Sequence, residues 1–170
     1  MNFDLTDSQE LMRDSFARFL CEHSSMARVR AAAPRGFDEA LWHGLAELGA
    51  FAMRVPEGDG GLGLGTFDAV VLMEQVGKAL ALGPIAETLV AARLLAALGH
   101  PQGKALLPQV LGGNAVVTLA FHDVADMPCQ WIAGGAVAQA IIARDSDSLV
   151  LIAPGDGPRG EPNLASTALA

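Results

Sequence analysis

The sequence has little of what most often marks a site: two cysteines, no tyrosine and eleven Lys and Arg residues. Cys21 and Cys129 lie far apart and belong to no CxxC or Cys/His pattern. Zinc sites and disulfide frameworks need closely spaced ligands or several cysteine pairs, so we expect no bound metal and no disulfide. Two reduced thiols are typical of a cytoplasmic protein, and that location is predicted here.

The eleven basic residues are scattered, and no run of about 18 apolar residues occurs in the sequence. With a formal net charge of -8 and no basic stripe, the chain has no electrostatic attraction to phosphate backbones or to anionic membranes. The N-terminus begins Asn2-Phe3-Asp4, unlike the basic region and apolar run of a signal peptide. The sequence therefore predicts neither nucleic acid nor a membrane as a partner.

What is abundant is hydrophobic residues, 51% of the chain with Ala and Leu prominent, a composition typical of packed helices. A first helix is predicted from Thr6 to Glu22, because Thr6 with Gln9 and Asp7 with Glu10 both offer capping-box pairs. Further helices are predicted at Met26–Ala32, from Asp38 to a stop at Gly49, from a Thr66 N-cap to Leu80, at Ile85–Leu98 and at Gln102–Leu111. Several are apolar on most sides, which predicts packing against further protein.

After Gly113 the pattern changes from helical to β. Ala115–His122 and Ser148–Ala153 read as strands, and a weaker strand is predicted at Ala136–Ala143. The tail from Gly155 is rich in Gly, Pro, Asn and Ser. Three short strands cannot protect both edges of a sheet, so we expect a β domain that has been cut or has decayed. The predicted fold class is α+β, with a helical domain at 1–112 and a partial β domain at 113–170.

The segment 51–65 contains Pro56 and five glycines and is predicted to be a loop. Gly61, Gly63 and Gly65 have GxG spacing, yet no strand precedes them and no GxxG follows before the next helix. A dinucleotide-binding turn is therefore not expected. We favour a packing turn over a direct phosphate contact.

Three segments resemble the acyl-CoA dehydrogenase family. Residues 55–69, Val-Pro-Glu-Gly-Asp-Gly-Gly-Leu-Gly-Leu-Gly-Thr-Phe-Asp-Ala, resemble its PExxGGxGxxxxD signature. The opening from Phe3 to Glu10 resembles the family's "F.LTeeQ", and the segment from Leu41 to Gly49 resembles its "l.elGl" helix. The resemblance covers about residues 3–111 and fades in the β segment. It implies a helical domain, a middle β domain and a C-terminal helical domain, in oligomers that bind flavin adenine dinucleotide (FAD).

The resemblance implies α,β-dehydrogenation of an acyl-CoA thioester, in which a glutamate removes the α proton while hydride leaves to the flavin. That glutamate normally lies in the C-terminal domain, so no catalytic residue is assigned within this chain. Glu74 is interpreted as a structural or interface acid. Glu87 matches a position that lines the end of the family's acyl pocket, with Val90 and Ala91 as neighbours. Pocket lining and plain helix packing both stay open for these three residues.

The family's first middle-domain strand usually reads close to ALTEPxAGSD, whereas this chain reads Ala120-Phe-His-Asp-Val-Ala-Asp-Met-Pro. By the resemblance, Phe121 would meet the flavin through its backbone, and His122 stands where a flavin-contacting Thr is expected. His122 is interpreted either as an alternative acid/base or hydrogen-bonding group, or as a structural or solvated histidine. These differences from the family sequence, including a shortened segment after Trp131, predict that this chain binds FAD weakly.

Two functions follow from these observations. In the first, the chain is a fragment or subunit of a flavin-dependent acyl-CoA dehydrogenase, acting on an acyl-CoA substrate as a homo-oligomer or with a second dehydrogenase-like subunit. In the second, it is a degenerate, non-catalytic subunit with a scaffold or interaction role. We favour the enzyme, since the resemblance explains more of the sequence. The isolated chain is expected to be inactive.

Overall fold

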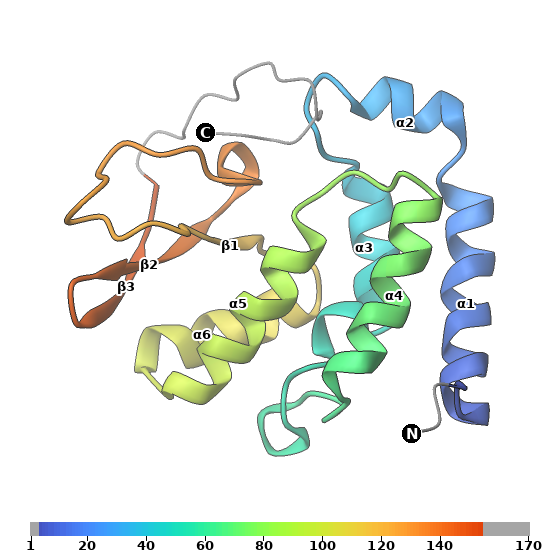
Figure 1. The fold of residues 1–170 in the computed structure, drawn as a ribbon, viewed down its shortest axis with the longest axis horizontal. Helices are drawn as coiled ribbons and strands as arrows, with labels where there is room; N and C mark the ends of the chain where they lie inside the picture. The colour runs from blue at the N-terminus through green and yellow to red at the C-terminus, as the bar shows by residue number, and fades with distance from the viewer. Residues whose placement is uncertain (1–3, 155–170) are drawn as a thin grey trace.

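The computed structural model describes residues 4–154, so the predictions made on Phe3 and on the tail from Gly155 to Ala170 lie outside the described residues. Helices precede strands along the described chain (Figure 1), and the predicted α+β fold is confirmed. The α-helices are α1 (Asp7–His23), α2 (Met26–Ala32), α3 (Glu39–Glu47), α4 (Thr66–Lys78), α5 (Ile85–Leu98) and α6 (Pro101–Leu111). The strands are β1 (Val117–Leu119), β2 (Ala140–Asp145) and β3 (Ser148–Ile152). Short 3-10 turns lie at η1 (Ala50–Ala52), η2 (Glu57–Asp59) and η3 (Gly135–Val137).

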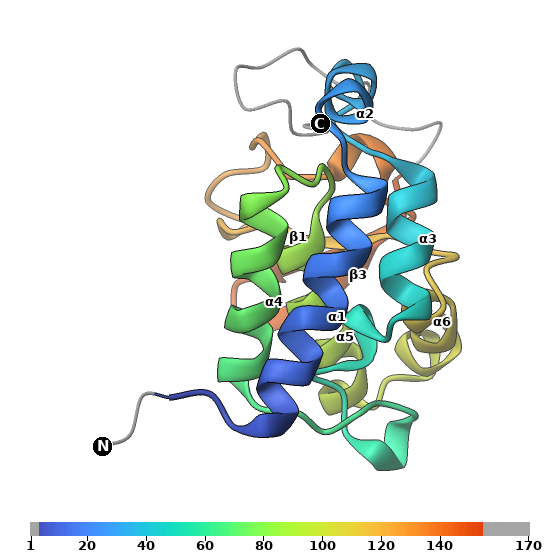
Figure 2. The same cartoon turned by 90° about the vertical axis from the view of Figure 1, so that its right-hand side faces the viewer.

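The helices α1, α3 and α4 lie side by side, and α5 and α6 lie between this layer and the small sheet (Figures 1 and 2). One apolar core fills the helical layer. Its centre is Trp42 of α3 against Phe51 of η1, with ring centroids 4.1 Å apart and both side chains buried. Aromatic pairs at this spacing add to the free energy gained by burial alone. Phe16 and Phe37 are buried in the same core.

The start of α1 forms the capping box predicted from Thr6 and Gln9. The Thr6 Oγ1 accepts from the Gln9 N–H at 3.3 Å, and the Gln9 Oε1 accepts from the Thr6 N–H at 3.0 Å. Gln9 also donates from Nε2 to the Asp68 carboxylate at 2.8 Å. One side chain therefore caps α1 and ties its first turn to the first turn of α4.

The start of α4 differs from the prediction by one residue. Thr66 is the first helical residue, and the N-cap is Gly65, whose backbone is extended at φ -77° and ψ 170°. The Gly65 N–H donates to Asp68 Oδ2 at 2.6 Å. The Asp68 carboxylate therefore does the capping from within the first turn, where its charge also matches the helix dipole. A Thr66 N-cap was the wrong expectation, because the acid three residues beyond Gly65 takes that role.

A second apolar core joins α5 and α6 to the sheet. Ala91 and Ala92 of α5 are fully buried against the first strands, and Val117 of β1 is fully buried from the other side. Thr88, also fully buried, donates its hydroxyl to the Val117 carbonyl oxygen at 2.9 Å. Alanine side chains allow the helix and strand backbones to approach closely. The sheet is thus built directly onto α5, and the predicted division at 112/113 stays a prediction.

The sheet has the order β1-β2-β3, with β1 parallel to β2 and β2 antiparallel to β3. β1 is shorter than predicted at both ends, and β2 begins four residues later and ends two residues later than predicted. Residues 135–137 form η3, because Gly134 at φ 71° turns the chain before β2 can begin. β1 ends at Leu119, and the N–H of His122 is bonded to a side chain of its own loop instead of a neighbouring strand. Only the last predicted strand, now β3, lies close to its expected bounds.

Several large apolar side chains of α4 and α5 are exposed. Phe67 and Val70 of α4 are 50% and 56% exposed, and Val90 of α5 is 50% exposed. The packing against further protein that the sequence predicts stays a prediction, and these are the side chains it concerns. Across residues 4–154, no helix combines the length and the apolar character needed to cross a membrane.

Replacing Thr88 with Val keeps the shape of the side chain and removes the hydroxyl that bonds the Val117 carbonyl. We expect the free energy of unfolding to fall by about 1 kcal/mol, because one buried hydrogen bond between α5 and β1 is lost. Urea unfolding followed by circular dichroism measures the change.

The matched control is Ser15→Ala, since the Ser15 hydroxyl also donates to a carbonyl, that of Leu11 at 2.8 Å, but on the exposed surface of α1. Its effect should stay below about 0.5 kcal/mol. An equal loss in both variants would show that the bond between α5 and β1 carries no special weight.

Candidate functional site

The two residues predicted to meet a flavin, Phe121 and His122, lie in the loop that directly follows β1. Phe121 is 70% exposed and the His122 side chain is exposed as well. Trp131, later in the same loop, is 67% exposed. An exposed aromatic side chain is costly to leave in water and useful for binding, so this loop is a candidate interaction site.

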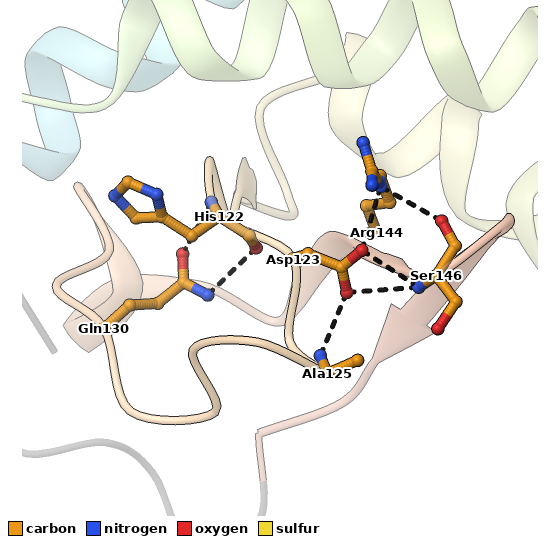
Figure 3. A network of polar contacts seen from close by, with 6 residues as sticks. All are labelled: His122, Asp123, Ala125, Gln130, Arg144 and Ser146. Carbon is orange, nitrogen blue, oxygen red and sulfur yellow. Dashed lines mark hydrogen bonds and ion pairs between the residues drawn. The ribbon is translucent and has the colours of Figure 1, made fainter.

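The peptide group of His122 is already bonded within the loop (Figure 3). Its N–H donates to Gln130 Oε1 at 3.0 Å, and its carbonyl accepts from Gln130 Nε2 at 3.1 Å. The same Nε2 donates to the Met127 carbonyl at 3.0 Å. The Gln130 side-chain amide therefore takes the place of a neighbouring strand in bonding the backbone of His122. The imidazole of His122 extends away from the Asp123 carboxylate (Figure 3).

Asp123 ties this loop to the turn between β2 and β3 (Figure 3). Its carboxylate accepts from the N–H of Ala125 at 2.9 Å, from the N–H of Ser146 at 3.1 Å, and from Arg144 Nε at 2.9 Å. Ser146 has a positive φ of 55°, which a bonded turn such as this one stabilises. The backbone N–H of Ser146, then that of Ala125, then Arg144 lower the pKa of Asp123, against an opposing effect of burial.

These contacts bear directly on the flavin role implied by the resemblance. The backbone groups of His122 are bonded to Gln130, and the Asp123 carboxylate is fully engaged by its own loop and turn. The ring faces of Phe121 and Trp131 stay about two-thirds exposed. The described loop therefore does not by itself enclose a flavin ring. Contact of Phe121 and His122 with a flavin stays a proposal that requires further protein around this loop.

The second predicted site, on the first half of α5, is divided between two faces of the helix. Val90 lines a mostly apolar groove of about 520 Å³ between α4 and α5, together with Val70 and Met73. Ala91 is fully buried in the core against the sheet. Glu87 is half-buried and is not part of the groove lining. The structure thus brings Val90 to a groove, but not the three residues together, and their substrate role stays a prediction.

Glu74 also lines the groove between α4 and α5. It is exposed and forms an ion pair with Lys78 one turn later on α4, with Oε1 and Nζ 2.8 Å apart. An exposed ion pair at this spacing contributes only about 0.3–0.5 kcal/mol to the free energy of unfolding. Glu74 therefore lies at the rim of the groove with a partner of its own, as suits a surface acid.

The glycine loop uses its backbone groups internally. The Gly61 N–H donates to the Pro56 carbonyl at 3.0 Å, and the Gly63 N–H donates to the Val55 carbonyl at 2.8 Å. A Cβ added at Gly61 would lie 2.1 Å from the Val55 carbonyl oxygen, so only glycine permits this close approach. N–H groups bonded in this way do not cradle a phosphate, which supports the interpretation as a packing turn.

Sequence reasoning missed Asp123, Gln130 and Arg144 as the residues that shape the loop. An Asp whose carboxylate bonds the N–H two residues later is a known turn pattern, so Asp123 with Ala125 was open to prediction. The bonds to Arg144 and Ser146 join segments about twenty residues apart and left no local signal. Within residues 4–154, no three His, Cys, Asp or Glu side chains are grouped so as to hold a metal ion.

Asp123→Asn removes the charge that the loop stabilises. Because the folded chain lowers the pKa of Asp123, folding favours the charged carboxylate, and this stabilisation is present at neutral pH. It is lost as the pH falls below the ordinary carboxyl value of about 3.9 and the group becomes protonated. We therefore expect Asp123→Asn to unfold more easily than the parent chain at neutral pH, and the gap to narrow in acid. Urea unfolding at a series of pH values measures it.

Asp126→Asn is the control for this series. Asp126 lies in the same loop and is exposed, and its carboxylate has no partner among the described residues. Its effect on the free energy of unfolding should be small at every pH. A difference in free energy of unfolding between the parent and Asp123→Asn that stays constant to the lowest pH would contradict a role of the Asp123 charge.

Comparison with known proteins agrees with the helical part of the fold. A family model described as "Acyl-CoA dehydrogenase, N-terminal domain" matches residues 6–114. The chain is 31% identical over 146 residues to acyl-CoA dehydrogenase IpdE2 of Mycobacterium tuberculosis, which covers 84% of this chain and 44% of that protein. It is 37% identical over 103 residues to benzylmalonyl-CoA dehydrogenase of Aromatoleum aromaticum, covering 59% of this chain and 27% of that protein.

Solved structures have the same fold. A variant of the Tcur3481-Tcur3483 steroid ACAD superposes with a TM-score of 0.70 at 27% identity, over 85% of this chain and 47% of that chain. The ChsE4-ChsE5 complex from Mycobacterium tuberculosis superposes with a TM-score of 0.75 at 24% identity, over 92% and 50%. The chain therefore spans about half the length, or less, of these relatives and structures. With a family model matched over more than half of its length, the chain belongs to the acyl-CoA dehydrogenase family.

Proposed function

We propose that the chain is the amino-terminal part, as a fragment or a subunit, of a flavin-dependent enzyme that oxidises an acyl-CoA thioester between its α and β carbons. The observation that carries the proposal is the match to relatives named as acyl-CoA dehydrogenases over the whole helical region. Among them, benzylmalonyl-CoA dehydrogenase and the steroid ACAD are named for ring-bearing substrates. We therefore propose a bulky, ring-bearing acyl group for this chain.

In this proposal the residues of the chain position substrate and partner and do not themselves transfer protons. Val90, in the groove between α4 and α5, contacts part of the acyl group. Phe121, His122 and Trp131 form the exposed surface of the loop after β1, against which flavin-bearing protein packs. The catalytic base is supplied from outside these 170 residues, since no glutamate described here lies in an enclosed site with a second reacting group.

The partner we propose is a second dehydrogenase-like subunit or a second copy of the chain. One matched structure is named as a ChsE4-ChsE5 complex, and another is named for two proteins, Tcur3481 and Tcur3483. The exposed apolar side chains of Phe67 and Phe121 are ones that such a partner would cover. We also propose a cytoplasmic location, because Cys21 and Cys129 are both free and exposed.

A specific observation favours a second function, that of a non-catalytic subunit. The peptide group of His122 is closed by Gln130, and Asp123 holds the loop in this closed form. A loop that satisfies its own polar groups has no need of a cofactor for its structure. In this alternative the helical domain is kept as a scaffold and the loop after β1 serves as part of the interface.

The first test compares the purified chain alone with the chain co-expressed with a second dehydrogenase-like subunit. We expect the chain alone to hold no stoichiometric FAD, and to reduce no artificial electron acceptor with benzylmalonyl-CoA or a steroid CoA thioester. With the partner, both flavin and turnover should appear. Turnover by a complex that holds no flavin would contradict a flavin-dependent dehydrogenase. A complex that forms but has neither flavin nor turnover would favour the scaffold role.

Variants of the assembled protein test whether the side chains of Phe121 and His122 contact the flavin, or whether any change in the loop lowers flavin binding. Phe121→Ala and His122→Ala should each lower the flavin retained per chain after gel filtration, since both side chains lie on the exposed face of the loop. Asp126→Ala is the control in the same loop and should retain flavin as the parent does. Flavin content equal to that of the parent in all three variants would mean that the side chains of Phe121 and His122 do not meet the cofactor.

A second test narrows the groove between α4 and α5. Val90→Trp adds bulk at a side chain that is 50% exposed, so folding should be nearly unaffected while the groove is filled. In the assembled enzyme we expect KM for a ring-bearing thioester to rise about tenfold or more, with a smaller change for a short straight-chain thioester. Steady-state kinetics with both substrates measures the difference.

Ala105→Trp is the control for Val90→Trp, because Ala105 is exposed on α6 and lies outside the groove. Its KM values should match those of the parent enzyme. The same rise in KM for both thioesters in Val90→Trp, or none for either, would remove Val90 from the acyl site.

A further inference from the structure

The groove between α4 and α5 has a charge pattern that the proposed function does not yet use. Its lining is mostly apolar but includes two cations and one acid, Arg54, Arg93 and Glu74. The Glu74 carboxylate is balanced by its ion pair with Lys78. In a chain with a net charge of -8, the lining of this groove therefore carries more positive than negative charge. This charge bears on which acyl groups the groove accepts.

Both cations lie at the same end of the groove. Helices α4 and α5 run in roughly opposite directions, so the start of α4 lies opposite the later part of α5 (Figure 1). Arg93 lies in that later part of α5. Arg54 reaches the start of α4, where its Nη1 donates to the Leu64 carbonyl at 2.7 Å, two residues before the helix begins. Glu74, in the later half of α4, lies toward the other end.

Arg93 lies on the same face of α5 as the apolar residues of the groove. Ala86, Leu89, Val90 and Arg93 recur at helical spacing, and all four line it. Val90 lies one turn before Arg93, so a ligand that contacts the Val90 side chain reaches Arg93 by extending along α5. Arg93 is exposed and Val90 is half-exposed, so both side chains are accessible to such a ligand.

The end of the groove remote from Arg93 lies toward the loop that is proposed to meet the flavin. That loop returns to the start of α5, where a Cβ added at Gly134 would lie 2.4 Å from the Pro84 Cβ. Arg93 lies about 12 Å further along α5 than Ile85, its first residue, by the rise of an α-helix. A thioester held beside the loop would thus direct the far end of its acyl group toward Arg93.

We propose that the groove accepts an acyl group whose end remote from the thioester carries a carboxylate, and that Arg93 binds this carboxylate, with Arg54 at the same end. The inference rests on the proposed function, because it takes the acyl group to lie along Val90. A guanidinium presents N–H donors in a plane that matches a carboxylate, and an apolar lining strengthens the attraction between the charges. Arg93 is therefore a residue that determines substrate specificity.

Two thioesters that differ in charge but hardly in shape test the proposal with the assembled enzyme. One is para-carboxyphenylbutanoyl-CoA, and the other is its uncharged amide, para-carbamoylphenylbutanoyl-CoA. We expect kcat/KM to be about tenfold higher for the carboxylate, because only the carboxylate forms a charge-assisted contact with Arg93. Turnover of both with equal kcat/KM, or a preference for the amide, would overturn the carboxylate site and leave the dehydrogenase function standing. Turnover of neither, or of any other ring-bearing thioester, would overturn both proposals.

Variants of Arg93 separate its charge from its bulk. Arg93→Met keeps a long side chain without the charge, and should raise KM for the carboxylate substrate about tenfold while the amide substrate is nearly unaffected. Arg93→Lys keeps the charge and should lose less.

Arg30→Met is the control for Arg93→Met, since Arg30 is exposed on α2 and lies outside the groove. Its KM values should match those of the parent enzyme, and a rise as large as in Arg93→Met would show an unspecific effect of net charge. An equal rise for both thioesters in Arg93→Met would place Arg93 against a part that they share, such as the phosphates of CoA. Either result would overturn the proposal.

Discussion

The contact between α5 and β1 attaches the small sheet to the helices. Ala91 and Ala92 have side chains small enough to let the strand lie close to the helix, and the Thr88 hydroxyl bonds the Val117 carbonyl across the contact. Burial of apolar surface supplies most of the stability of such a contact, and the hydrogen bond fixes its register. The loop with Phe121 and His122 begins just after β1 ends, so its position follows from this contact.

Much of the helical region could be predicted from local signals. Capping by Thr6, the largely apolar composition of α5 and the glycine stop at Gly49 are all local features of the sequence. The strands were harder, because β1 is ended by a bond from the Gln130 side chain and β2 is delayed by η3, and neither event has a strong local pattern. The start of α4 was misplaced by one residue for a different reason: a local signal was present in Asp68, three residues after Gly65, but Thr66 was taken as the cap.

The candidate sites show the same limit. The positions of Phe121, His122 and Val90 follow from resemblance and from their places in the elements, but their surroundings do not. Asp123 bonds to Arg144 and Ser146, which lie about twenty residues later in the sequence. Membership of the acyl-CoA dehydrogenase family is fixed by the helical domain. The chemistry of the chain depends on the loop after β1, where the polar groups of His122 and Asp123 bond to their own protein.

We expect the helical domain and the small sheet to unfold as one cooperative unit joined at α5 and β1. Native-state hydrogen exchange of the 170-residue chain tests it most directly, because it reports the free energy of opening at each amide. Protected amides of β1 and β2 should open with about the same free energy as those of α5, and Thr88→Val should lower the opening free energy of all of them together. Strand amides that exchange by a separate, much lower-energy opening, while α5 stays protected, would contradict it.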